Sequence, residues 1–365
     1  MEFALSADQT MMQDSVVKTL DRVCPLDRVK SAVQEKAPYA RDVWQSLVEL
    51  GIPALLIPEA HGGLGLSLLD ATLVSEALGR SVAPVPFIAS CVMAPIALAE
   101  AGNEAQQAHW LPKLASGEAI AGVAIAEQVS GAHNGVGVTA SNGKLDGMAL
   151  FAMDFGAADL FVVADRDRNL HLIDATASGL ERIALTTIDG TRSLGELRFS
   201  NVDAEPLNAA NDAVVLTQMR DAGWVMLAAD TLGAGTRMIE KAVDYAKERQ
   251  QFGRPIGSFQ AVKHLCAEMA AELEPCRALV WYAAHAFDGP SPSEASLTAA
   301  HAKAHLSEIG RFVARTATEV HGGIGITDLL GLHYWFKRIG LDRQLLGGPE
   351  RVRHLAAVMQ GFAVA

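Results

Sequence analysis

Residues 249–264, RQQFGRPIGSFQAVKH, lie between two long stretches of helical periodicity and decide how the C-terminal part of the chain folds. Upstream, apolar and small residues recur at spacings of three and four from Val225 onward, which predicts a single helix running to about Arg249. Downstream, a second helix is expected from about Ser258 to Phe287. The stretch is therefore expected to connect two long helices.

Two more helices are expected beyond this pair. Ser291, Pro292 and Glu294 combine a capping box with proline at the first helical position, which predicts a helix start. The glycines of HGG at 321–323 are expected to end that helix. A last helix is expected over 349–360, which makes the C-terminal part a predicted four-helix bundle.

The periodicity of the chain changes at about residue 119. Before it, from residue 7, apolar residues follow helical spacing. After it, short segments rich in Val, Leu, Ile and Thr are separated by Gly, Asn and Asp, as in strands near 120–126, 134–141, 158–164, 169–173, 180–186 and 194–200. We predict an α+β fold with a helical domain over 1–118, a β-barrel or β-sandwich domain over 119–207, and the four-helix bundle over 208–365.

The composition excludes several classes of protein. A net charge of −12 over 365 residues disfavours a general nucleic-acid surface. The start of the chain shows no export signal and no apolar run approaches the ~20 residues of a membrane span, so we expect a cytoplasmic protein without membrane contact. Free, buried thiols and no metal site are expected, because no CxxC pair or His cluster accompanies the cysteines, Cys24, Cys91, Cys266 and Cys276.

A glycine-rich segment, PEAHGGLGLS at 58–67, admits two interpretations. Its glycines suit a tight turn, and they could also line a ligand cleft. The segment is too short for a dinucleotide-binding fingerprint, which also requires a preceding strand.

Four segments, in this order, resemble the acyl-CoA dehydrogenase family: WQSLVELGIPALLIPEAHGGLGLS at 44–67, WLPKLASGEAIAG at 110–122, RQQFGRPIGSFQAVKH at 249–264 and HGGIGIT at 321–327. The similarity spans nearly the whole chain. It implies a flavin-dependent enzyme, with FAD as cofactor, that removes hydrogens from the α and β carbons of an acyl-CoA thioester. Such chemistry needs a base for the α proton and hydrogen-bond donors at the thioester oxygen.

In this family the FAD lies across a subunit interface, and its adenine and pyrophosphate half reaches the two C-terminal motifs of a neighbouring subunit. The resemblance assigns this role to Arg249, Gln251, Phe252, Phe259, Gln260, Glu319, Gly322 and Gly323. Arg249 offers a permanently charged fork to a pyrophosphate. Alternatively, Arg249 is an ordinary arginine at a helix C-terminus, where the helix dipole favours positive charge, and Phe252 and Phe259 pack in the core. Glu319 stands where the family usually has glutamine.

The segments that hold the flavin ring in the family are altered in this chain. AEQVSGAHNG at 126–135 replaces the family's Thr-Glu-Pro-x-x-Gly-Ser-Asp run, with Ala126 at the threonine position. GMALFAMDFGAAD at 147–159 lacks the usual lysine and the Trp-Ile-Thr type segment. The ring side is therefore expected to have lost its hydrogen-bonding groups.

The family's catalytic glutamate is missing as well. It corresponds to Gly347 in LLGGPERV at 345–352, and the alternative position on the first helix of the bundle corresponds to Gly223. Glycine cannot accept a proton. Four nearby residues could substitute. Glu350 is better explained by helix capping, and Asp221 points to another face of its helix than Gly223. No pattern in the sequence places His333 or Asp342 at the site.

The sequence therefore favours an incomplete subunit of a heteromeric α2β2 acyl-CoA dehydrogenase. A second, complete subunit would supply the base, and an electron-transfer flavoprotein would accept the electrons. The resemblance points to bulky or ring-bearing acyl-CoA thioesters, as in fatty acid or steroid side-chain degradation. The alternatives are a self-sufficient homotetramer with a displaced base, a flavin-free acyl-CoA-binding scaffold, and a flavin hydroxylase or oxidase of the same fold.

Overall fold

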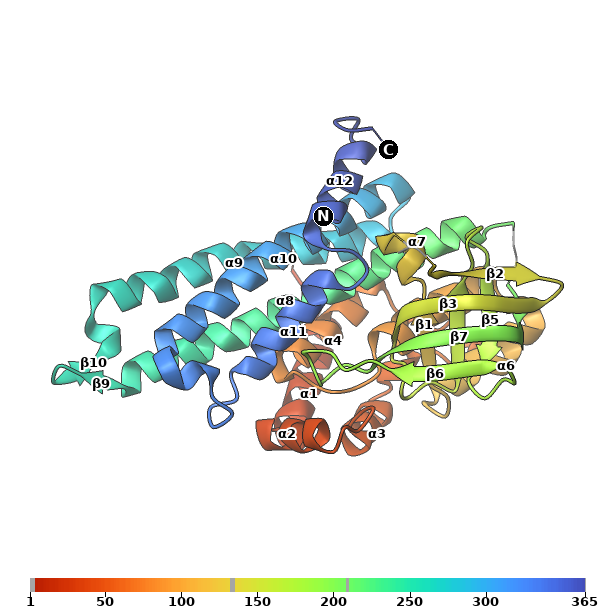
Figure 1. Cartoon of the computed structure of the whole chain (residues 1–365). Coiled ribbons are helices and arrows are strands. Elements are labelled where there is room, and N and C mark those ends of the chain that lie inside the picture. Colours follow the sequence, from red (N-terminus) through yellow and green to blue (C-terminus); the bar gives the residue numbers. More distant parts are fainter. Residues whose placement is uncertain (1–3, 132–134, 208–209, 365) are drawn as a thin grey trace.

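The computed structural model describes residues 4–131, 135–207 and 210–364. A curled sheet lies at one side of the molecule, long helices extend away from it, and shorter N-terminal helices pack beside both (Figure 1). The N-terminal helices are α1 (Ala7–Val23), α2 (Leu26–Gln34), α3 (Arg41–Glu49), α4 (Leu68–Ser81), α5 (Ala94–Ala101) and α6 (Glu104–Ala115), with a π-helical segment, η3 (Ile88–Met93), before α5. Because α4 packs along both α1 and α8, it joins this part to the C-terminal helices.

The glycine-rich segment at 58–67 forms a tight turn. Gly62 has a φ of +80°, and a Cβ at Gly63 would overlap the carbonyl group of Ile57. The amide of Leu64 donates to the carbonyl oxygen of Ala54 at 2.9 Å. The segment therefore folds back on its own backbone, which favours the structural interpretation over a ligand cleft.

The middle part is one sheet with the order β6-β7-β3-β1-β4-β5-β8, to which β2 adds beside β3. Its strands are β1 (Ala121–Ala124), β2 (Gly137–Ser141), β3 (Lys144–Met153), β4 (Leu160–Ala164), β5 (Leu170–Asp174), β6 (Leu180–Ala184), β7 (Leu194–Asp203) and β8 (Glu205–Pro206). β1 and β4 are parallel, and the other pairs are antiparallel. Among the described strands β6, β8 and β2 each pair with a single neighbour, so the sheet is an open, curled half-barrel.

Strand β3 was not predicted from the sequence, although it lies between β7 and β1 near the middle of the sheet. Its pairing with β7 shifts register twice, between Leu145 and Gly147 and between Ala149 and Ala152. Phe151 has a φ of +54° within the second irregularity. Each bulge adds a residue to one strand and breaks the two-residue alternation that identifies strands in a sequence.

The C-terminal part contains the helices α8 (Asp212–Glu248), α9 (Gln260–Phe287), α10 (Pro292–His321), α11 (His333–Gln344) and α12 (Pro349–Met359). Four of them confirm the predicted helices, although α8 begins at Asp212, well before the Val225 from which its periodicity was recognised. At the start of α10 the hydroxyl of Ser291 accepts the Glu294 amide at 3.3 Å, and at its end Gly322 has a φ of +64°. The predicted last helix, α12, packs against α10.

Helix α11 was missed by the sequence analysis. It packs on α8 and α10, and its buried face carries charged as well as apolar side chains. Arg338 and Asp342 are each only 1% exposed. Its N-cap, Leu332, makes no side-chain capping bond. A helix whose buried face carries charges and whose start lacks a capping residue does not show the usual amphipathic pattern.

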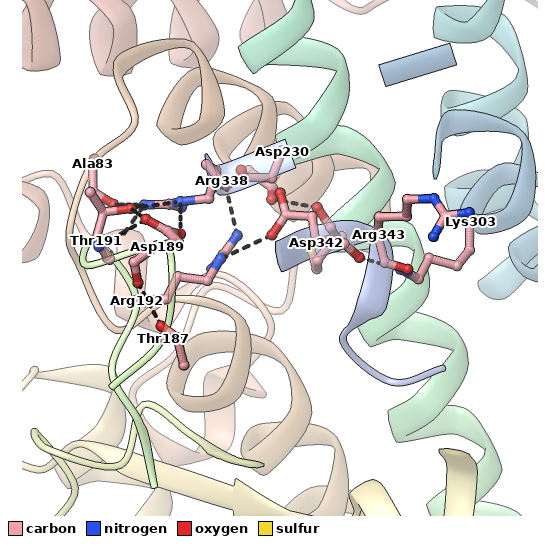
Figure 2. Close-up of polar contacts among 12 residues, drawn as sticks. Ala83, Thr187, Asp189, Thr191, Arg192, Asp230, Lys303, Arg338, Asp342 and Arg343 are labelled. Carbon is pink, nitrogen blue, oxygen red and sulfur yellow. Dashed lines mark hydrogen bonds and ion pairs between the residues drawn. The ribbon is translucent and has the colours of Figure 1, made fainter. Parts of the chain in front are cut away.

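A buried ionic network surrounds α11 (Figure 2). Arg338 pairs with Asp189 at 3.1 Å and with Asp230 of α8 at 3.2 Å, and it donates to the Thr191 hydroxyl at 2.7 Å and to the Ala83 carbonyl oxygen at 2.9 Å. These partners come from the N-terminal part, from the loop before β7 and from α8. One guanidinium therefore ties all three parts of the fold together.

The network continues toward the C-terminal end of α11. Arg192 pairs with Asp230 and with Asp342, each at 3.0 Å. Lys303 of α10 donates to the carbonyl oxygens of Asp342 and Arg343. Burial raises the pKa of the Asp342 carboxyl well above its usual range and lowers the pKa of Lys303 to about 7.

In the described part of the chain, no helix is long and apolar enough to cross a membrane. All four cysteines are free thiols, and Cys24, Cys91 and Cys276 are buried. Burial raises the pKa of the Cys276 thiol to about 11.

We predict that Arg338→Met lowers the free energy of unfolding by about 3–5 kcal/mol, because Asp189 and Asp230 would lose their guanidinium partner in the interior. Urea denaturation at fixed protein concentration measures the effect. The control is Arg353→Met, which removes a half-exposed arginine whose ion pairs are 3.8 and 3.9 Å long and should cost less than about 1 kcal/mol. Equal losses in the two variants would contradict a role for the network.

Candidate functional site

The first C-terminal motif forms a small hairpin at the end of the helical bundle farthest from the sheet (Figure 1). Strands β9 (Gln250–Gln251) and β10 (Arg254–Pro255) pair across a turn in which Phe252 and Gly253 have φ values of +54° and +78°. Arg249 and Gln251 are exposed, and the Phe252 side chain is 92% exposed. The hairpin thus holds an arginine and an aromatic ring out into solvent.

Aromatic and cationic groups gather beside this turn. The rings of Phe252 and Phe259 meet edge to face with centroids 6.1 Å apart, and the Arg254 guanidinium lies 4.1 Å from the Phe259 centroid. Gln260 lies exposed at the start of α9, with its amide nitrogen 2.9 Å from a ring nitrogen of His264. The high exposure of Phe252 is inconsistent with core packing. Arg254 is a second cation of this motif that the sequence analysis did not single out.

The second C-terminal motif lies at the same end of the bundle. Tyr245, near the end of α8, stacks on His321, the last residue of α10, with ring centroids 4.7 Å apart. Gly322 and Gly323 follow in a short 3-10 turn, and a Cβ at either position would meet no atom within 4 Å. Glu319 is exposed one turn earlier. The fold therefore brings together both motifs that the resemblance assigned to a neighbour's FAD.

This end of the bundle also exposes large apolar side chains. Ile326 is 73% exposed and Leu329 is 81% exposed, close in the chain to the glycine pair. A surface that combines exposed apolar residues with cations and open backbone is typical of a binding interface.

The altered ring-side segments meet at a second place, between the sheet and the loop that joins α11 to α12. They line a cavity of about 280 Å³. The first of these segments begins with a short helix, α7 (Ala126–Ser130). The lining residues are Ala126, Glu127, Ser130, Gly131, Val136, Leu150, Phe151, Met153, Leu341, Gln344, Leu345 and Leu346. Segments far apart in the chain thus converge at this cavity, while 132–134 of the first segment lie outside the described residues.

The lining of this cavity is mostly apolar. Ala126, Phe151 and Met153 bring no hydroxyl or amine into it. Among the described residues of the lining, Glu127 is the one that is acidic, and it was not singled out from the sequence. Its carboxylate accepts a hydrogen bond from the backbone amide of Leu150. Because Leu150 belongs to β3, this bond ties α7 to the irregular central strand.

The two expected base positions differ in the space around them. Gly347 has a φ of +104°, which disfavours any side chain, although a Cβ there would lie 3.7 Å or more from its neighbours. A Cβ at Gly223 would lie 2.6 Å from Cδ1 of Leu346 and 3.2 Å from the sulfur of Met93. A side chain is therefore strained at the first position, and at the second it would require Leu346 and Met93 to shift.

None of the acids and bases considered as substitutes lines the cavity. Glu350 is exposed and pairs with Arg343 at 3.0 Å, and Asp221 pairs with Arg220 at 2.7 Å on the far side of α8 from Gly223. His333 lies 2.7 Å from Asp328, and Asp342 belongs to the buried network.

Two family profiles match the chain, "Acyl-CoA dehydrogenase, N-terminal domain" over residues 6–118 and "Acyl-CoA dehydrogenase, C-terminal domain" over residues 214–360. Acyl-CoA dehydrogenase IpdE2 of Mycobacterium tuberculosis is 32% identical over 348 residues, which cover 94% of this chain and 95% of that protein. The chain belongs to the acyl-CoA dehydrogenase family. It is thus an oxidoreductase of the acyl-CoA dehydrogenase type, and FAD is the cofactor that membership implies.

Other relatives of this acyl-CoA dehydrogenase agree in length and fold. Acyl-CoA dehydrogenase FadE27 of Mycobacterium tuberculosis is 28% identical and covers 90% of each chain. The ChsE4-ChsE5 complex from Mycobacterium tuberculosis is similar at a TM-score of 0.90, with 26% identity and full coverage of both chains. A variant of the Tcur3481-Tcur3483 steroid ACAD is similar at a TM-score of 0.87, with 27% identity and coverage of 97% and 98%.

We predict that Gly223→Ala destabilises the protein by about 1–3 kcal/mol, because the added methyl group has no room beside Leu346 and Met93. Gly340→Ala is the matched control, since Gly340 is an exposed residue of α11 with no atom within 4 Å of its added Cβ. That control should be neutral or stabilising by up to about 1 kcal/mol. Urea denaturation compares the two, and a neutral Gly223→Ala would show that the space beside α8 is open.

Proposed function

We propose that this chain is the incomplete subunit of a heteromeric acyl-CoA dehydrogenase and that it acts with a second, catalytically complete subunit. The observation that carries the proposal is the asymmetry between its two half-sites. The end of the bundle keeps groups suited to a neighbour's cofactor, whereas the chain's own ring side and base positions do not.

The bundle end fits the adenine and pyrophosphate half of FAD. Arg249 and Arg254 supply permanent positive charge, and arginine binds phosphate groups in a bidentate manner. Gly322 and Gly323 leave the backbone open to close approach, since no atom lies within 4 Å of an added Cβ. Phe252 offers an exposed ring for stacking. In this proposal these residues bind and orient the cofactor of a partner subunit.

The chain's own ring side does not fit the isoalloxazine. Its cavity of about 280 Å³ lies below the ~300–1,000 Å³ of typical ligand sites. A complete site would need more room still, because it would have to hold a thioester as well as the flavin ring. Position 126 is alanine and position 153 is methionine, so these side chains offer no hydrogen bond to a flavin ring. We therefore assign no catalytic step to this cavity.

The base would come from the partner subunit. Proton abstraction needs a positioned acceptor within hydrogen-bond reach of the α carbon. Neither glycine can supply one, and the Glu127 carboxylate is already engaged with the amide of Leu150. When bound, FAD supplies the hydride acceptor for α,β-dehydrogenation.

The relatives support pairing and suggest a substrate class. Two of the similar solved structures carry pair names, the ChsE4-ChsE5 complex and the Tcur3481-Tcur3483 steroid ACAD. We propose an α2β2 heterotetramer acting on a bulky or ring-bearing acyl-CoA thioester, in fatty acid or steroid side-chain degradation. Its reduced flavin would pass electrons to an electron-transfer flavoprotein rather than to oxygen, and the complex would work in the cytoplasm.

We expect the isolated, folded chain to show no acyl-CoA dehydrogenase turnover with a dye acceptor, because both base positions are glycine. Co-expression with a complete partner should yield an α2β2 complex with about two FAD per tetramer. Mass photometry and flavin absorbance measure the assembly and the FAD content. Turnover by the chain alone, or four FAD per tetramer, would contradict the proposed division of labour.

Arg249→Ala should lower the FAD content of the complex and weaken FAD binding by about tenfold or more, because a charge-assisted bond to phosphate contributes roughly 1.5–3 kcal/mol. The control is Arg311→Ala, which removes an exposed arginine from the middle of α10 and should leave the FAD content unchanged. An unchanged FAD content in Arg249→Ala would show that this motif does not serve the partner's cofactor.

A further inference from the structure

The loop between α11 and α12, residues Leu345 to Gly348, buries a leucine against α8. Leu346 has a φ of +55° and is only 4% exposed. Its Cδ1 lies 2.6 Å from the place where a side chain at Gly223 would begin. A leucine with positive φ is strained, so the surrounding contacts must hold it there.

The indole of Trp224 holds the loop in this position. Its Nε1 donates to the carbonyl oxygen of Leu346 at 2.8 Å, and Trp224 is fully buried. The guanidinium of Arg220 lies 4.4 Å from the indole centroid and is itself paired with Asp221 at 2.7 Å. Because a broken bond would leave the buried indole N–H unpaired, the loop is held firmly.

The filled space is where an acyl group would have to react. In complete members of the family the base stands at the position of either Gly347 or Gly223, and a base at either place must reach the same α carbon. The reacting carbons must then lie between these two positions. In this chain the side chain of Leu346, the residue before Gly347, reaches the space beside Gly223, and Met93 of η3 packs there as well.

We propose that Leu346 is a plug that closes this chain's own acyl site, so that acyl-CoA binds only to the partner subunit. The substrate class in this inference rests on the proposed function, whereas the plug rests on the contacts of Leu346. A plug also has a physical advantage over an empty site. An apolar cavity left by a lost substrate site destabilises a fold, and a leucine that fills it restores packing.

The test is photolabelling of the assembled complex with a medium-chain acyl-CoA that carries a terminal diazirine. Peptide mass spectrometry then locates the label. In the wild-type complex the partner should be labelled, and this chain should carry roughly tenfold less label or none at α8 and the loop at 345–348. Labelling of the wild-type chain at these two segments would overturn the plug.

The variant Leu346→Ala should open the site and admit the label beside Gly223. Its matched control is Leu306→Ala, which truncates a buried leucine of α10 that does not line the cavity and is not among the atoms near an added Cβ at Gly223. A gain of label in Leu346→Ala alone is the expected result, and equal labelling of the two variants would show that Leu346 is not what closes the site. Leu346→Val, which removes a single methylene, keeps the test valid if the alanine variant does not assemble.

The FAD content of the same wild-type samples separates the two proposals. Four FAD per tetramer with an unlabelled chain would overturn the division of labour and leave the plug standing. Two FAD per tetramer with a labelled chain would overturn the plug alone.

Discussion

The pairing of buried charges around α11 is the constraint on which the rest of this structure depends. Charged groups in the interior require partners, and here the partners come from separate parts of the chain: Asp189 from the loop before β7, Asp230 from α8 and the Ala83 carbonyl from the N-terminal part. Satisfying Arg338 therefore sets how the sheet and the two helical parts lie relative to one another. A purely apolar junction would allow more ways of packing, since hydrophobic contacts have no direction.

The same network positions the loop between α11 and α12, in which glycine occupies position 347. Lys303 binds the carbonyl oxygens at the C-terminal end of α11, where such groups lack partners within the helix, and the loop follows directly. Trp224 then binds the carbonyl oxygen of Leu346. The loop turns through positive φ at residues 346 and 347 and buries the Leu346 side chain beside Gly223, in the space that we propose complete subunits leave open to substrate.

In the proposed function, loss on one side and retention on the other follow from how a shared site is built. A cofactor held across an interface needs one half-site from each subunit. Here one candidate half-site lies at the far end of the helical bundle, and the other lies where the sheet meets the loop between α11 and α12 (Figure 1). The long helices α8, α9 and α10 separate the hairpin at Arg249 from Ala126 and Gly347, so either region can change without direct contact with the other. In a heteromer, a subunit with a degenerate ring half can still complete the site of its partner through its adenine half. In a homomer with the same defect, every site would be defective.

The sequence by itself determined the order of the parts, most of the long helices, the family, and the absence of a base at two positions. Those features depend on local periodicity, capping residues and motif spacing, as at Ser291 and in residues 249–264. It did not reveal β3, whose bulges break the alternation, or α11, whose buried face carries Arg338 and Asp342. It also did not reveal that Glu127 lines the cavity or that Leu346 fills the space beside Gly223. Only the tertiary structure decided these points, because they depend on contacts between residues far apart in the chain, whose partners no local pattern encodes.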